Sequence, residues 1–200
     1  MKRLVLYVHG KGGSPQESKH YQSLFPESDV MGLDYKSQTP WEAKSEFSYL
    51  YDSYSEGYDS VILIANSIGA FLSMYALSEK KISQAMFISP IVNMEKLIMD
   101  MMMQSNVTEE ELQSKKEIPT AFGETLSWNY LCYVRKHPIK WNIPTCILYG
   151  AKDNLTSGET VSAFADRIGA VLTVMEDGEH WFHTDEQMKV LDNWIRNSIR

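Results

Sequence analysis

The chain has 200 residues, which is enough for one domain with a large buried core. Its hydrophobic share of 44% and charged share of 22% are ordinary for a globular protein. The formal net charge of -7 argues against nucleic-acid binding, because phosphate backbones require a basic surface, and it gives no attraction for acidic membranes.

The N-terminal segment carries two basic residues and then only a short apolar run before His9, too short for a signal-peptide core. An apolar stretch that could span a bilayer is also missing, so we expect no membrane partner. Cys132 and Cys146 are not spaced as a metal-binding pair and are expected to be free thiols. These features favour a cytoplasmic protein.

Short apolar runs alternate with segments of helical periodicity along the chain. Several of the runs lack polar alternation, which is typical of strands covered on both faces. This order predicts an α/β fold of three layers, a doubly wound, mostly parallel six-stranded sheet between helices. Functional groups should then lie at the carboxyl ends of the strands. The predicted strands are residues 3–8, 29–33, 60–65, 84–89, 145–150 and 171–176, and the predicted helices are residues 15–25, 40–56, 67–79, 157–168 and 183–198.

Residues 91–141 interrupt this alternation. They hold no convincing strand, and Thr108 followed by Glu111 resembles a capping box that opens a short helix. Because the segment is too long for a plain connection, we expect a mostly helical insertion, either a lid or a small subdomain. The remaining features indicate a single domain over residues 1–200.

A serine follows the third predicted strand, in the stretch ANSIGA. Ser67 would open the next helix, which is the strand–turn–helix context of a nucleophile elbow. Such a turn needs small residues two positions before and after the serine. Gly69 meets this demand, and Ala65 adds one methyl group to the usual glycine. A simple serine N-cap is the alternative interpretation.

Two further polar residues follow later strands. Asp153 comes after the fifth strand, in YGAKDNLT, and His180 after the sixth, in DGEHWF. A serine hydroxyl becomes a good nucleophile when a histidine takes its proton and a carboxylate orients that histidine. The order Ser, Asp, His is the order of the α/β hydrolases. His183 is a rival for the base, and Asp177 for the acid.

The first strand is followed by HGKGGS, whose glycines let the backbone turn tightly and expose N–H groups. A phosphate loop is not favoured, because neither G-x-x-x-x-G-K-[ST] nor G-x-G-x-x-G occurs. A developing oxyanion needs two backbone donors. We expect these to be the amides of Ile68 and Lys11.

The motifs HGKGGS, ANSIGA, YGAKDNLT and DGEHWF together resemble those of the α/β-hydrolase superfamily, from about residue 3 to the C-terminus. The resemblance implies a serine hydrolase that acts through an acyl-enzyme. It also implies the strand order 2-1-3-4-5-6, with the family's two leading strands missing. The sequence departs from the pattern at Ala65, and its insertion at 91–141 matches no subfamily that we can name.

The insertion is rich in apolar residues at helical spacing, which suits a hydrophobic pocket as well as core packing. We therefore expect an esterase that cleaves carboxylic esters of small, largely apolar substrates without a metal or organic cofactor. Lys11 offers an alternative, a carboxylate-bearing substrate. A thioesterase, an amidase or peptidase, an acyltransferase and a non-catalytic binding module are the alternative functions. The expected pocket residues are His9, Gly12, Met94, Ile98, Met101, Trp128 and Trp181.

Overall fold

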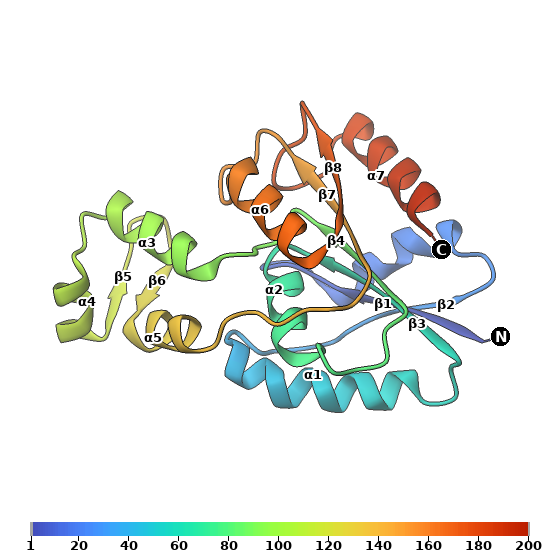
Figure 1. The fold of residues 1–200 in the computed structure, drawn as a ribbon, viewed down its shortest axis with the longest axis horizontal. Helices are drawn as coiled ribbons and strands as arrows, with labels where there is room; N and C mark the ends of the chain where they lie inside the picture. Colours follow the sequence, from blue (N-terminus) through green and yellow to red (C-terminus); the bar gives the residue numbers. More distant parts are fainter. Residues whose placement is uncertain (1, 200) are drawn as a thin grey trace. The chain divides into compact units, whose positions relative to one another are not determined.

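A computed structural model describes residues 2–199. The chain forms two compact units, residues 2–92 with 140–199 and residues 93–139. The first unit contains a six-stranded, wholly parallel sheet in the order β2-β1-β3-β4-β7-β8 (Figure 1). Counted within this sheet alone, that is the order 2-1-3-4-5-6, and the α/β fold class is confirmed. The sheet strands are β1 (Arg3–Val8), β2 (Asp29–Gly32), β3 (Ser60–Asn66), β4 (Gln84–Ile88), β7 (Thr145–Gly150) and β8 (Val171–Met175).

Helices cover both faces of the sheet because the chain crosses it in two directions. From β1 to β2 it moves toward one edge, whereas from β3 to β4 and from β7 to β8 it moves toward the other. Right-handed connections then place η1 on one face and α2 and α6 on the opposite face. The change of direction falls between β1 and β3, where such sheets bind ligands. The helices of this unit are η1 (Pro15–Leu24, a 3₁₀ helix), α1 (Pro40–Ser55), α2 (Ser67–Ala76), α6 (Gly158–Ile168) and α7 (Asp185–Ser198).

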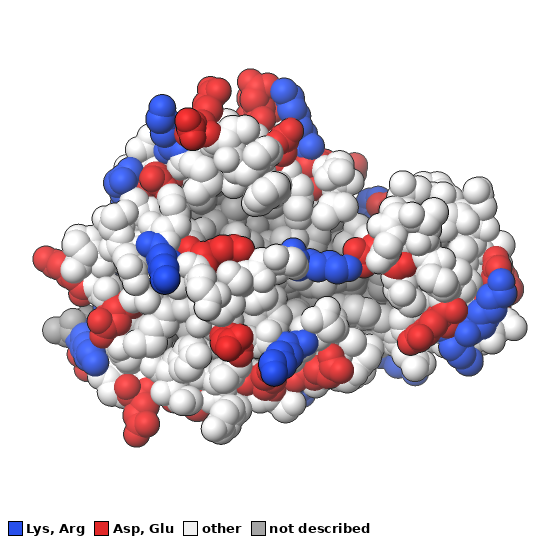
Figure 2. Space-filling model, turned by 180° about the vertical axis from the view of Figure 1, so that it is seen from behind, with Lys and Arg blue, Asp and Glu red and all other residues white. Residues whose placement is uncertain are grey.

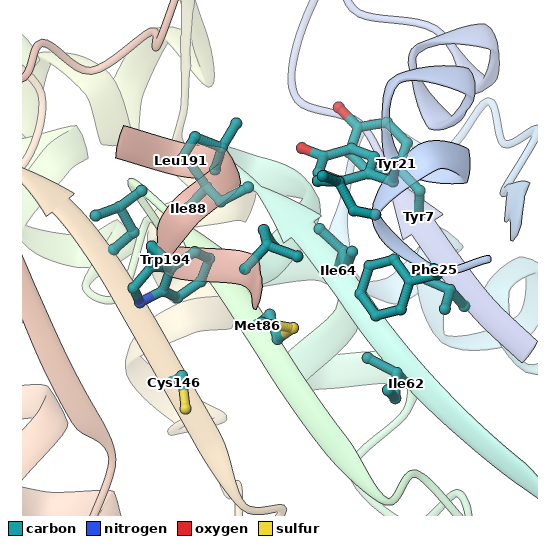
Figure 3. Packing of buried hydrophobic residues seen from close by; sticks show 14 of the residues in the cluster. Tyr7, Tyr21, Phe25, Ile62, Ile64, Met86, Ile88, Cys146, Leu191 and Trp194 are labelled. Carbon is teal, nitrogen blue, oxygen red and sulfur yellow. The ribbon is translucent and has the colours of Figure 1, made fainter. Parts of the chain in front are cut away.

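One apolar core lies between the sheet, η1 and α7 (Figure 3). Alternate residues of the strands face it, as Tyr7, Ile64 and Ile88 do, because successive strand side chains point to opposite faces. Burying each large apolar side chain stabilises the fold by roughly 1.5–3 kcal/mol. The core therefore fixes the carboxyl ends of β1, β3 and β4 relative to one another.

The second unit corresponds to the insertion expected at 91–141. The expectation that it holds no strand is wrong, because β5 and β6 pair in an antiparallel hairpin. The strands are only three residues long, too short to show a period of two in the sequence. Their turn depends on Gly123, which has a φ of 86°. The elements are α3 (Met94–Gln104), α4 (Glu109–Lys115), β5 (Glu117–Pro119), β6 (Thr125–Ser127) and α5 (Trp128–Lys136).

Acidic and basic side chains are interspersed on the face that Figure 2 shows. Within the described residues 2–199, we find no helix that is both long and apolar enough to cross a membrane.

Candidate active site

The turn between β3 and α2 holds Ser67 in a strained conformation. Its φ is 50°, in the left-handed region that residues with a Cβ atom rarely adopt. Gly69 allows the turn, because a Cβ atom there would lie 2.2 Å from the carbonyl oxygen of His9. The N-cap of α2 is Asn66, so the interpretation of Ser67 as an ordinary N-cap is wrong.

Three side chains form a hydrogen-bonded chain that begins at this serine. The Oγ atom of Ser67 lies 2.8 Å from Nε2 of His180, and Nδ1 of His180 lies 2.7 Å from Oδ2 of Asp153. A carboxylate only accepts hydrogen bonds, so Nδ1 carries the ring proton and Nε2 can accept the serine hydroxyl. The predicted base therefore lies within hydrogen-bonding distance of both the predicted nucleophile and the predicted acid.

Asp153 is held rigidly. Its side chain is fully buried, and its Oδ1 atom accepts the backbone N–H groups of Leu155 at 2.7 Å and Thr156 at 3.0 Å. These bonds satisfy the oxygen that does not contact His180 and offset the cost of burying the carboxylate. The loop after β7 thus orients the acid through its own backbone N–H groups.

The two rival residues lie elsewhere. Asp177 is 79% exposed and pairs with Lys152 at 2.6 Å, which lowers the pKa of the aspartate through a side-chain hydrogen bond and its charge. The ring of His183 is exposed, stacks on Trp181, and donates from Nδ1 to the carbonyl oxygen of Trp181. Neither residue contacts Ser67 or His180 through a hydrogen bond that the structure records.

Two glycines bring the loops of the acid and the base together. A Cβ atom at Gly150 would lie 2.4 Å from the carbonyl carbon of Gly178, and one at Gly178 would lie 2.9 Å from Cα of Gly150. Lys152 donates its backbone N–H to the carbonyl oxygen of Gly178 at 2.8 Å. This close approach sets the separation of Asp153 and His180.

The two predicted oxyanion donors belong to turns that lie next to Ser67. The amide of Ile68 is in the first turn of α2, where backbone N–H groups lack helical acceptors, and the side chain of Asn66 does not cap it. Lys11 lies in a tight turn closed by the bond from Gly13 N–H to the Gly10 carbonyl at 3.1 Å. A Cβ atom at Gly10 would be only 3.3 Å from Cβ of Ser67, so this turn passes close to the nucleophile.

A cavity of about 580 Å³ opens at Ser67 and His180. Of the residues expected in the substrate pocket, Gly12 and Trp181 line it. His9 does not, because its buried ring stacks on Tyr35 and its Nδ1 atom lies 2.8 Å from the Gly10 carbonyl. Met94, Ile98, Met101 and Trp128 belong to the second unit, and their contribution to a pocket stays a prediction.

Sequence reasoning missed most of the cavity wall. Tyr7, Glu17 and Asn66 give it a polar part. The signals were weak, since Tyr7 reads as one more apolar strand residue and Ser14-Pro15-Gln16-Glu17 as a helix start. The apolar part is formed by Tyr21, Ile88, Leu155, Phe182, Met188 and Leu191.

Within the described part of the chain, His, Cys, Asp and Glu side chains form no group of three or more that could hold a metal ion.

Comparisons with solved structures show the same architecture. Est1E from Butyrivibrio proteoclasticus superposes with a TM-score of 0.75 at 15% identity, covering 98% of this chain and 86% of its own. The chain has the α/β-hydrolase fold. Mouse alpha/beta hydrolase domain-containing protein 10 gives a TM-score of 0.75 at 15% identity, covering 97% of this chain and 88% of that one. The thioesterase domain from the curacin biosynthetic pathway gives 0.61 at 15% identity, covering 98% and 92%. No protein-family model and no curated protein matches the sequence.

In this α/β-hydrolase fold, the serine, histidine and aspartate follow β3, β8 and β7 and meet at the carboxyl edge of the sheet. The glycine turn after β1 lies at the same edge, next to the change in strand direction. The site therefore occupies the position that the topology of an open α/β sheet favours for a ligand.

Proposed function

We propose that the protein is a serine hydrolase that cleaves carboxylic esters of small, largely apolar substrates through an acyl-enzyme. One observation carries this proposal, the continuous chain from Ser67 through His180 to the buried Asp153. The strained backbone at Ser67 supports it, because such strain persists where the surrounding structure enforces it for function.

The chemistry follows from these groups. His180 Nε2 takes the hydroxyl proton while Oγ of Ser67 attacks the ester carbonyl carbon. The carbonyl oxygen becomes an oxyanion that accepts the amide hydrogens of Ile68 and Lys11. The imidazolium then gives its proton to the leaving alkoxide, the ester C–O bond breaks, and the acyl group stays on Ser67.

Water completes the cycle. His180 takes a proton from a water molecule, whose oxygen attacks the acyl carbon, and the proton returns to Oγ of Ser67 as the acid leaves. Asp153 stabilises the imidazolium in both halves and keeps the ring in the correct tautomer. These steps need no group other than protein side chains, backbone amides and water.

The cavity supports a largely apolar substrate. Tyr21, Phe182 and Leu191 form much of its wall, and pockets of this size that are mainly apolar suit small organic groups. The exposed ring of Trp181 stands at the same cavity. We expect the apolar group next to the scissile ester bond to be buried against these side chains, and this burial should favour substrate binding.

A fluorophosphonate probe tests the nucleophile, and graded 4-nitrophenyl esters test the pocket. We expect the probe to label Ser67, located by peptide mass spectrometry, and not the Ser67→Ala variant. The Ser73→Ala variant is a matched control, because Ser73 lies in the same helix with its hydroxyl bonded to the Gly69 carbonyl. Labelling that survives Ser67→Ala would contradict the proposal, and equal rates for acetate, butyrate and octanoate would contradict an apolar pocket.

A thioesterase is the second candidate, because one similar structure is a thioesterase domain. The same acyl-enzyme would form from a thioester, with a thiolate as leaving group. Matched butyrate ester and butyryl thioester substrates separate the two, since the preferred leaving group gives the higher kcat/KM.

We also propose a cytoplasmic location. Cys132 and Cys146 are free thiols in the structure, which a reducing compartment maintains. Fractionation of cells that express the full chain tests this.

A further inference from the structure

A polar chain runs along the cavity wall next to the nucleophile. Asn66 donates from Nδ2 to the hydroxyl of Tyr7 at 2.9 Å, and Tyr7 donates to Oε2 of Glu17 at 2.5 Å. Asn66 directly precedes Ser67, and all of these residues line the cavity. Figure 3 shows the rings of Tyr7 and Tyr21 beside each other with both hydroxyl oxygens at the same end.

The direction of these bonds is fixed by the tyrosine. Burial, followed by the charges of Tyr21 and Glu17 and the bond to Glu17, raises the pKa of Tyr7 far above its ordinary value. The hydroxyl of Tyr7 therefore stays protonated and donates its one hydrogen bond to Glu17. Toward Asn66 it can then act only as an acceptor. The chain thus ends on the carboxylate, which is its final acceptor.

Glu17 keeps unused acceptor capacity. Its Oε1 atom accepts the backbone N–H of Ser14 at 3.1 Å, and its Oε2 atom accepts Tyr7. A carboxylate offers roughly four acceptor positions, and the described residues fill two with these bonds. The residue as a whole is exposed while it lines the cavity, so a ligand can reach the remaining positions.

Helix capping alone does not account for this arrangement. Glu42 has the same capping role at α1, with Thr39 as N-cap and a proline at the first helical position. Its carboxylate accepts backbone N–H groups of Gln38 and Thr39 and is not part of the cavity wall. Glu17 differs in that a buried tyrosine donates a hydrogen bond to it and in that it lines the cavity that contains the nucleophile.

We propose that the part of the substrate in this cavity carries a hydrogen-bond donor, a hydroxyl or a protonated amine, that Glu17 accepts. This inference rests on the proposed ester hydrolysis and specifies its substrate class. The group is a polar end on an otherwise apolar chain, since Phe182, Met188 and Leu191 are among the apolar side chains that line the cavity.

Besides the two tyrosines, Glu17 and His180, the charged or titratable side chains in the lining of this cavity are those of His20 and Lys11. His20 lies 2.7 Å from Asp192 of α7 at Nε2, so its ring is engaged at the cavity margin. Lys11 also lines the cavity and carries a positive charge. Because the charges of Glu17 and Lys11 are opposite, a neutral hydroxyl group on the substrate gives the most direct test of hydrogen bonding to Glu17.

The test uses two matched ester series with the full-length protein. The first series consists of 4-nitrophenyl hexanoates that carry a methyl, hydroxyl, methoxy, ammonium or carboxylate group at the end of the acyl chain remote from the ester. The second series consists of acetates of hexan-1-ol that carry the same groups at the remote end of the alcohol chain. We expect the hydroxyl ester to exceed the methoxy ester in kcat/KM by about tenfold in one series, because only the hydroxyl can donate to a charged acceptor. Glu17→Gln should lower this ratio about tenfold, and the matched control Glu42→Gln should leave it unchanged.

The outcomes separate the two proposals. Equal rates for hydroxyl and methoxy esters in both series, an unchanged ratio in Glu17→Gln, or a preference for the carboxylate ester would overturn the inference and leave ester hydrolysis standing. A lack of Ser67-dependent turnover of every ester would overturn the proposed function instead. Because each ratio compares two substrates on one enzyme, a general loss of activity in Glu17→Gln does not affect it.

Discussion

The strain at Ser67 leads to the prediction that glycine at this position gives a more stable protein than alanine. Ser67→Ala and Ser67→Gly both remove the hydroxyl that bonds to His180, so both should be inactive. They differ only in the Cβ atom at a position with a φ of 50°. We expect the glycine variant to be the more stable of the two.

The size of the difference follows from two opposing terms. A Cβ atom in the left-handed region costs roughly 1–2 kcal/mol, which glycine avoids. Glycine loses more backbone freedom on folding, which costs roughly 0.5–1 kcal/mol. The balance favours Ser67→Gly by about 1 kcal/mol, or roughly 2–4 °C in Tm for a chain of this length.

Scanning calorimetry of both variants measures this difference. The matched control is Ala163→Gly, the same chemical change at an exposed position inside α6. There glycine should lower stability by about 1 kcal/mol, because the helical backbone suits alanine. The reasoning is refuted if Ser67→Gly unfolds at the same temperature as Ser67→Ala or below it.

The loops of the acid and the base give two further predictions. Asp153→Asn should lower kcat for ester hydrolysis by about 10⁴, since an asparagine does not hold the histidine in the required tautomer, whereas Asp177→Asn should keep the rate in the same steady-state assay. Gly178→Ala should lower both kcat and Tm, because its Cβ atom would meet the backbone of the neighbouring glycine at 2.9 Å and the loops must separate, at a cost of about 1–3 kcal/mol. A Gly178→Ala enzyme with unchanged kcat and Tm would contradict this reasoning, because it would show that the loops accommodate the extra methyl group without moving apart.

The strand pattern and the order of the polar residues were enough to predict the sheet and to bring three distant positions together. Each of Ser67, Asp153 and His180 follows a buried apolar run, and parallel strands end at a common edge. Any polar residue just after such a run becomes a candidate by this argument. The same reasoning therefore retained Asp177 and His183 as rivals.

The choice among rivals depended on contacts that the sequence does not encode locally. Asp153 is buried and held by two backbone amides, whereas Asp177 is exposed and forms an ion pair with a lysine. The polar cavity wall was missed for a related reason. Tyr7 and Glu17 each satisfy a local pattern, a strand and a helix start, and only the three-dimensional structure brings them together.

The departure at Ala65 from the usual elbow pattern has a steric explanation that can be tested. The close approach in this turn is at Gly69, where a Cβ atom would overlap the His9 carbonyl oxygen at 2.2 Å. The methyl group of Ala65 is instead fully buried within β3. Gly69→Ala should therefore displace the turn and abolish both ester hydrolysis and fluorophosphonate labelling. Ala65→Gly should keep activity and lose about 1 kcal/mol of stability, because glycine in a strand removes a buried methyl and adds chain freedom. If Gly69→Ala retained normal turnover, the helix would have another way to approach the glycine turn, and the steric account of the elbow would be wrong.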